Sequence, residues 1–203
     1  MAQSEHIKEQ VNKLKQELIL GKAIDLFYER GYRGASMGTI ASELGVTKPF
    51  LYYRYKSKAD VLAEVFARAE SLALAELLEQ LASDSPPDVK LRNIVRQLVE
   101  IALDNQKLLA VFYTEERNLP PRKIAKSRKI RVEWQENLGK LLEEGKRKKI
   151  FHYGDVEITV HAILGSVLWS YHWYPEYGSK RRDHIVRELT NTALALVGFE
   201  APK

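Results

Sequence analysis

A run of hydrogen-bond donors between residues 39 and 58 has the chemistry to contact a phosphate backbone. Lysine, arginine, tyrosine and threonine side chains are the usual protein donors to phosphate oxygens and base edges. Apolar residues recur between the donors at helical spacing, so that the apolar side can pack while the donors stay exposed. The donors are Thr39, Thr47, Lys48, Tyr52, Tyr53, Arg54 and Lys58. This combination of residue types and spacing indicates a nucleic-acid contact surface.

Two short helices on either side of Gly45 must position these donors. Ser36 can cap the first helix, which is expected to run to Leu44. Thr47 can cap the second, and Pro49 is tolerated in its first turn. Gly45 permits a tight turn, and the second helix could enter a DNA major groove about 12 Å wide. The pattern predicts a helix-turn-helix.

Nearly everywhere else in the chain, apolar residues recur three and four positions apart, which is the spacing of a helix, and no convincing strand pattern appears. Gly31 should end the first helix in a left-handed conformation. Helices are expected at about 11–30, 58–81, 88–103, 106–116, 122–148, 155–173 and 181–197, with a loop over 174–179. The fold class is therefore all-α with about nine helices. We expect an N-terminal three-helix helix-turn-helix domain over residues 1–56 and a C-terminal helical bundle for ligand binding and dimerisation over 57–203.

The amino-acid composition limits which partners the protein can bind and in which cellular compartment it is expected. The 203 residues carry 32 Lys and Arg against 27 Asp and Glu, a net charge of +5 that fits a nucleic-acid partner. The absence of cysteine excludes a disulfide framework, a cysteine-zinc site and a thiol nucleophile. Neither a signal-peptide core nor about 18 consecutive apolar residues are present. A cytoplasmic protein without a membrane partner is expected.

The residues around the predicted helix-turn-helix resemble the signature of TetR-family transcriptional regulators. The resemblance covers about residues 10–65 and rests on segments 31–32, 36–41, 44–48, 51–55 and 57–58. It implies an all-α homodimer with an N-terminal DNA-binding domain and a C-terminal ligand-binding domain. It also implies that Lys48, Pro49 and Phe50 face bases, whereas Tyr52, Tyr53 and Lys58 contact phosphates. For Arg54 a phosphate contact and a base contact both stay open.

Three later segments, 111–119, 163–166 and 173–175, resemble a TetR subgroup that responds to acyl-CoA thioesters in fatty-acid and steroid breakdown. This resemblance implies an acyl-CoA effector, which needs an apolar tunnel and cations for its phosphates. The candidate ligand-binding residues are Phe112, Tyr113, Arg122, Lys126, Trp134, Leu138, Trp169 and Trp173. The same residues also fit a plain aromatic core and a solvated cationic helix face.

Small residues in one of the last helices, together with apolar residues in the final helix, predict a dimer interface, because small residues permit close approach of helices. The candidate interface residues are the small Ala162, Gly165 and Ser166 and the apolar Ile185, Leu189, Ala193 and Leu196. The last two predicted helices would pair with those of a second copy to form a four-helix core. His161 and His172 share a face but are too far apart along a helix to bind one metal ion. We therefore expect neither a metal nor a resident cofactor.

These observations favour a TetR-like transcriptional repressor that binds operator DNA as a homodimer and is released by a small molecule. The alternative is an acyl-thioester or lipid carrier that does not act through DNA. No Gly-rich phosphate loop, Gly-x-Ser-x-Gly elbow or metal-ligand spacing occurs, so an enzyme is not expected.

Overall fold

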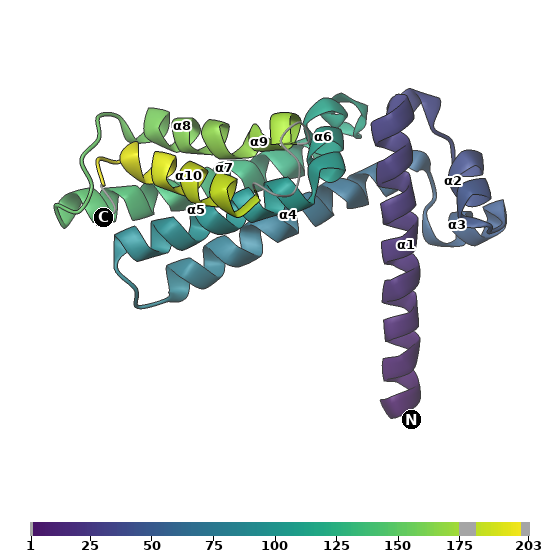
Figure 1. Ribbon diagram of the computed structural model, residues 1–203. Helices are drawn as coiled ribbons and strands as arrows, with labels where there is room; N and C mark the ends of the chain where they lie inside the picture. Colours follow the sequence, from purple (N-terminus) through teal and green to yellow (C-terminus); the bar gives the residue numbers. More distant parts are fainter. Residues whose placement is uncertain (1, 175–181, 200–203) are drawn as a thin grey trace. The chain divides into compact units, whose positions relative to one another are not determined.

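All regular elements of the computed structural model are helices over the described residues, 2–174 and 182–199 (Figure 1). The helices are α1 (Ala2–Gly34), α2 (Met37–Leu44), α3 (Lys48–Arg54), α4 (Lys58–Ala82), α5 (Pro87–Asp104), α6 (Gln106–Thr114), the 3-10 helix η1 (Glu116–Asn118), α7 (Pro121–Arg147), α8 (Val156–Leu168), α9 (Ser170–Trp173) and α10 (Arg182–Ala195). The predicted all-α class is confirmed. The helix expected over 155–173 is divided at Trp169, and the predicted loop lies outside the described residues from Pro175 onward.

The chain forms two compact units. Unit 1 comprises the residues up to Arg68 together with Ala110–Ala125, and unit 2 comprises Ala69–Leu109 and the residues from Lys126 onward. A segment from the middle of the chain thus belongs to the N-terminal unit. The functional boundary expected between residues 56 and 57 stays a prediction.

Local hydrogen bonds in unit 1 explain where α2 begins and ends. The Ser36 hydroxyl accepts a 3.0 Å bond from the Thr39 N–H, and the Thr39 hydroxyl accepts a 2.8 Å bond from the Ser36 N–H. This reciprocal pair is a capping box, which satisfies two otherwise unpaired donors. Gly45 ends the helix with φ 67°. Both helix boundaries were predicted from the sequence and are confirmed.

The first half of α1 exposes an apolar stripe, and the residues buried in its second half lie on a different face of the helix. Val11, Leu14 and Leu18 are 43%, 58% and 58% exposed, whereas Ile19 and Ala23 are buried. Each residue turns the helix by about 100°, which places the stripe on the face opposite the buried one. Periodicity therefore predicted the helix correctly but did not show which of its faces is covered. Gly31 has the positive φ that was expected, 66°, but its ψ of 165° is not that of a left-handed helical residue, and α1 continues past it to Gly34.

The core of unit 2 is built on α5, which packs against α8, α9 and α10 (Figure 1). Leu91, Ile94, Val95 and Leu98 line one face of α5 at helical spacing and are buried. On α7, Trp134 lies in the same core and its indole N–H donates a 3.1 Å bond to the Ala73 carbonyl. None of the described helices is sufficiently long and apolar to cross a membrane.

Candidate nucleic-acid interface

Helix α3 presents most of the predicted donors because its few buried residues hold it in place. Leu51 is fully buried and Tyr55, directly after the helix, is 3% exposed. Tyr52 is 51% exposed and Tyr53 is 95% exposed. Each ring offers an apolar face and a hydroxyl that can donate a hydrogen bond. The helix therefore offers one face for packing and another for contact.

The start of α3 is held by the backbone and not by a side chain. Thr47 stands at the N-cap position as expected, but its hydroxyl makes no capping bond. The Phe50 N–H instead donates a 3.1 Å bond to the Thr47 carbonyl. Thr47, Lys48 and Pro49 are all exposed. The end of α3 that could enter a groove first is thus accessible.

Three lysines line one surface depression of about 440 Å³ in unit 1. Its lining residues are Ser36, Met37, Gly38, Lys48, Tyr52, Lys56, Ser57 and Lys58. Ammonium and hydroxyl donors around a concave surface suit an anionic group such as a phosphate. The Lys48 stem crosses Gly38 so closely that a Cβ there would lie 2.9 Å from the Lys48 Cε. Lys56 was not among the residues predicted from the sequence.

Lys58 is tied to the protein, which the sequence did not show. Its Nζ donates to the Tyr32 carbonyl at 2.6 Å and to the Ala35 carbonyl at 2.7 Å. It also lies 4.1 Å from the centre of the Tyr32 ring. Burial lowers the pKa of the Lys58 amine, and the Glu115 carboxylate acts against this. The predicted phosphate contact of Lys58 stays a prediction, with at most part of its ammonium left for DNA.

Two side-chain contacts join α1 to α3. The Arg54 guanidinium donates a 2.8 Å bond to the Gln16 side-chain oxygen, and Lys15 Nζ lies 5.9 Å from the Phe50 ring centre. Arg54 is therefore directed toward α1. The separation of 38 residues between Arg54 and Gln16 explains why no local pattern revealed this pair.

The predicted ligand-binding residues are divided between the two units. Phe112, Tyr113 and Arg122 belong to unit 1, and the rest belong to unit 2. Phe112 is buried and packs on Phe66 with ring centres 4.7 Å apart. Arg122 is exposed, and Tyr113 is 46% exposed.

In unit 2 the predicted ligand-binding residues differ in burial. Trp134 and Leu138 belong to the buried core, Trp173 is half-buried, and Lys126 is exposed. Trp169 is 57% exposed and packs on His172, with ring centres 4.7 Å apart. Part of the predicted aromatic set is thus core, as the second interpretation of the sequence allowed.

The predicted interface residues also separate by burial. Ile185 and Ala193 are buried in the core of their own chain, and Leu189 is half-buried. Ala162, Gly165 and Leu196 are exposed, and the Ser166 hydroxyl donates to the Ile163 carbonyl at 2.8 Å. The two buried residues face inward because α10 uses that face against α5 and α8.

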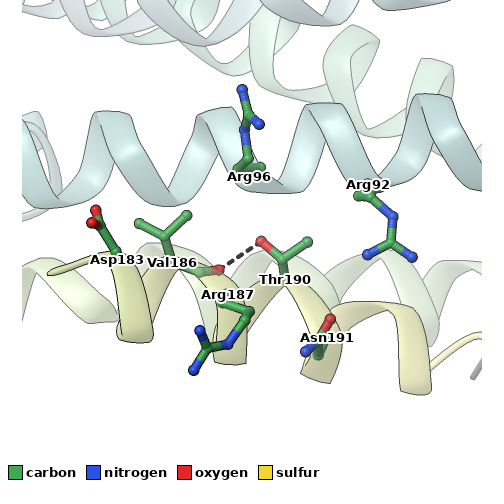
Figure 2. Close-up of a pocket in the computed structure, with 7 residues that line it drawn as sticks. All are labelled: Arg92, Arg96, Asp183, Val186, Arg187, Thr190 and Asn191. Atoms are coloured by element: carbon green, nitrogen blue, oxygen red, sulfur yellow. Dashed lines mark hydrogen bonds between the residues drawn. The ribbon is translucent and has the colours of Figure 1, made fainter. Parts of the chain in front are cut away.

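A groove of about 260 Å³ between α5 and α10 contains three arginines that do not converge (Figure 2). Arg96 and Arg187 extend in opposite directions (Figure 2). Arg96 lies 3.7 Å from the Glu100 carboxylate, and Arg187 lies 3.2 Å from that of Glu188. This groove is not an assembled anion site. Over the described residues, no group of three or more His, Asp and Glu side chains could hold a metal ion.

A short exposed helix braced on a second helix, with donors at its accessible end, defines a helix-turn-helix protein. Residues 19–65 match the profile of the bacterial regulatory proteins of the tetR family, and residues 84–197 match the tetracyclin repressor-like C-terminal domain. The second match covers more than half of the chain. The chain belongs to the TetR family of transcriptional regulators, and it is a regulator and not an enzyme.

Relatives and solved structures agree with this assignment. The regulator AcrR of Shigella flexneri is 30% identical over 101 residues, which are 49% of this chain and 46% of AcrR. The first curated relatives are matched over about half of their length or less. The crystal structure of PfmR from Thermus thermophilus has a TM-score of 0.79 at 26% identity, over 87% of this chain and 97% of PfmR.

AibR, solved in complex with isovaleryl coenzyme A and operator DNA, has a TM-score of 0.77 at 22% identity, over 87% of this chain and 96% of AibR. Similarity at this identity shows a shared fold.

Proposed function

We propose that this regulator is a repressor that binds operator DNA as a homodimer and is released by an acyl-CoA thioester. The observation that carries the DNA-binding part is the exposed face of α3, where Tyr53 is 95% exposed beside exposed Lys48 and Pro49. A carrier of acyl thioesters would gain nothing from this face. Binding to operator DNA also places the protein in the cytoplasm.

The contacts divide by role. The resemblance implies that Lys48, Pro49 and Phe50 face bases, and we keep this role for Pro49 and Phe50. Lys48 lines the depression of unit 1 with Tyr52 and Lys56, so we assign these three to phosphates. A dimer would place two α3 helices one DNA turn apart, roughly 34 to 36 Å. The test is fluorescence anisotropy with a duplex selected by the protein from a random DNA library, titrated at several salt concentrations. Affinity must fall with salt, and a duplex of scrambled sequence must bind more weakly.

The homodimer is supported by an exposed apolar stripe along α8 that continues to Trp169, directly after the helix. Ile158, Ala162, Gly165 and Trp169 follow one another at spacings of four, three and four residues. Ile158 is 71% exposed and Trp169 is 57% exposed. Small residues between two large apolar ones permit close approach of a second copy, and a twofold interface uses the same stripe from both chains. Sedimentation equilibrium should find a dimer, and a monomer at micromolar concentration would refute this interface.

The effector class is supported by the charge of α7. Six cations lie between residues 122 and 131 without one acid among them: Arg122, Lys123, Lys126, Arg128, Lys129 and Arg131. Cations in the first turns of a helix oppose its macrodipole, so an anionic partner would stabilise them. The phosphates of coenzyme A have this charge, and AibR was crystallised with such a thioester. The relevant positions here are the exposed Arg122 and Lys126.

The effector test compares isovaleryl-CoA and longer acyl-CoAs with their free acids. The thioesters should lower the anisotropy of the DNA complex, and their affinity should rise with acyl-chain length by about 0.8 kcal/mol for each further methylene that is buried. Arg122→Ala and Lys126→Ala should weaken the binding of acyl-CoA thioesters and should leave the affinity for DNA in the absence of ligand nearly unchanged. A DNA complex that responds to no acyl-CoA would remove this effector class and leave the repressor.

A further inference from the structure

Glu115 joins the middle of the chain to the corner between α1 and α2. Its Oε1 accepts a 3.2 Å bond from the backbone N–H of Tyr32, which is 83 residues away in the sequence. Its Oε2 accepts a 2.6 Å bond from the Asn118 side-chain amide. Tyr32 lies in the last turn of α1, five residues before α2 begins at Met37. One carboxylate therefore holds this corner from outside both helices.

The break at Gly31 explains why the corner needs an outside acceptor. Gly31 has φ 66° and ψ 165°, which are not helical values. This conformation turns the following N–H, that of Tyr32, out of the regular helical direction. A backbone donor without a partner is costly once it is removed from water. Glu115 supplies the missing acceptor, and a charged acceptor makes a stronger bond than a neutral one.

Lys58 fastens the same corner from the first turn of α4. Its Nζ donates to the carbonyls of Tyr32 and Ala35, one before and one after the end of α1. The Glu115 carboxylate favours the charged form of Lys58 against the effect of burial. Removal of Glu115 would leave a partly buried ammonium with less compensation. The two side chains thus bind the same backbone corner. Glu115 accepts from the backbone N–H of Tyr32, and Lys58 donates to the carbonyls of Tyr32 and Ala35.

The segment that carries Glu115 is anchored within unit 1. Residues 110–125 belong to this unit, and Phe112 is buried against Phe66 with ring centres 4.7 Å apart. Glu115 stands one turn after Phe112. The anchored aromatic ring fixes the end of α6, so the carboxylate has a defined position from which to hold Tyr32.

We propose that Glu115 is a positioning residue for operator binding, which orients α2 and α3 through the corner at Tyr32 without touching DNA. This inference rests on the proposed DNA-binding function. The corner leads directly into α2, and α2 packs against α3. A loosened corner would therefore reduce the fraction of the protein in which α3 is aligned for the groove, and apparent affinity falls with that fraction.

The experiment compares Glu115→Ala and Glu115→Gln with wild type by anisotropy on the selected duplex. Glu115→Ala should lower affinity about tenfold with an unchanged salt slope, because no phosphate contact is lost. The affinity of Glu115→Gln should lie between those of wild type and Glu115→Ala, since the glutamine amide oxygen still accepts a hydrogen bond from the Tyr32 N–H. Glu133→Gln removes the same charge from an exposed position on α7 and should bind like wild type.

Hydrogen exchange provides the readout that a general loss of stability would not reproduce. The peptide containing Tyr32 should exchange faster in Glu115→Ala, while peptides from the core of unit 2 stay unchanged. Wild-type affinity in Glu115→Ala would overturn the inference, and so would a salt slope lowered by about one, which reports a lost phosphate contact. A wild-type protein that binds no DNA would refute the proposed function itself, whereas an unaffected Glu115→Ala refutes the positioning role alone.

Discussion

Two glycines of α7 should respond to the same substitution in opposite directions. Gly145 is buried beneath the ring of Phe151, and a Cβ added there would overlap the ring, with the Phe151 Cγ only 2.8 Å away. Phe151 is 1% exposed and cannot move aside freely. A Cβ at Gly139 would instead meet Val156 Cγ2 at 3.7 Å, which is an ordinary contact.

The magnitudes follow from two opposing effects. Alanine is favoured over glycine by about 1 kcal/mol in a helix interior. Gly139→Ala should therefore stabilise the protein by about 0.5 to 1 kcal/mol. At Gly145 overpacking costs about 1 to 3 kcal/mol or more, which exceeds that gain, so Gly145→Ala should be destabilising. The propensity gain is common to both variants, so they should differ by the overpacking cost alone, about 1 to 3 kcal/mol or more.

Urea unfolding followed by circular dichroism measures this difference. All proteins must be compared at one concentration, because association shifts the apparent stability. In thermal unfolding, each kcal/mol corresponds to about 2 to 4 °C for a chain of this size. If Gly145→Ala proved as stable as Gly139→Ala, the close packing of Phe151 on α7 would be refuted.

Three further predictions concern the interface, the dimer and pH. Lys48→Ala should weaken binding to all duplexes similarly and lower the salt slope by about one, and an unchanged slope would show that Lys48 meets no phosphate. Trp169→Glu should place a charge on the exposed stripe of α8 and shift the sedimentation of the dimer toward the monomer; an intact dimer would place the interface elsewhere. Burial raises the pKa of Tyr55 to about 12, whereas the pKa of a tyrosine in the unfolded chain is about 10. The stabilisation from the neutral Tyr55 hydroxyl is therefore complete below about pH 10 and is lost as pH rises through about 12. Tyr55→Phe should lose less stability than wild type between about pH 10 and 12, and parallel pH curves from urea unfolding would contradict this.

The helix-turn-helix could be predicted from the sequence because its signals are local. The capping box joins Ser36 and Thr39, which are three residues apart, and Gly45 ends α2 by its own backbone conformation. Such interactions form within one turn of helix, so residue types and spacing are sufficient to identify them. The donors of α3 followed from the same argument, since Leu51 and its apolar neighbours had to face the other way.

Tertiary structure alone decided which helix faces are covered and which distant residues meet. The spacing of Val11, Leu14 and Leu18 predicted a helix, yet this stripe is exposed, while the expected interface residues Ile185 and Ala193 are buried in their own chain. The pairing of Glu115 with Tyr32 spans 83 residues. Periodicity shows which side chains share a face, but the neighbour that covers this face depends on how all helices pack together. For this reason Lys58, which was predicted to contact DNA, was found bound to the corner between α1 and α2, which the distant Glu115 also binds.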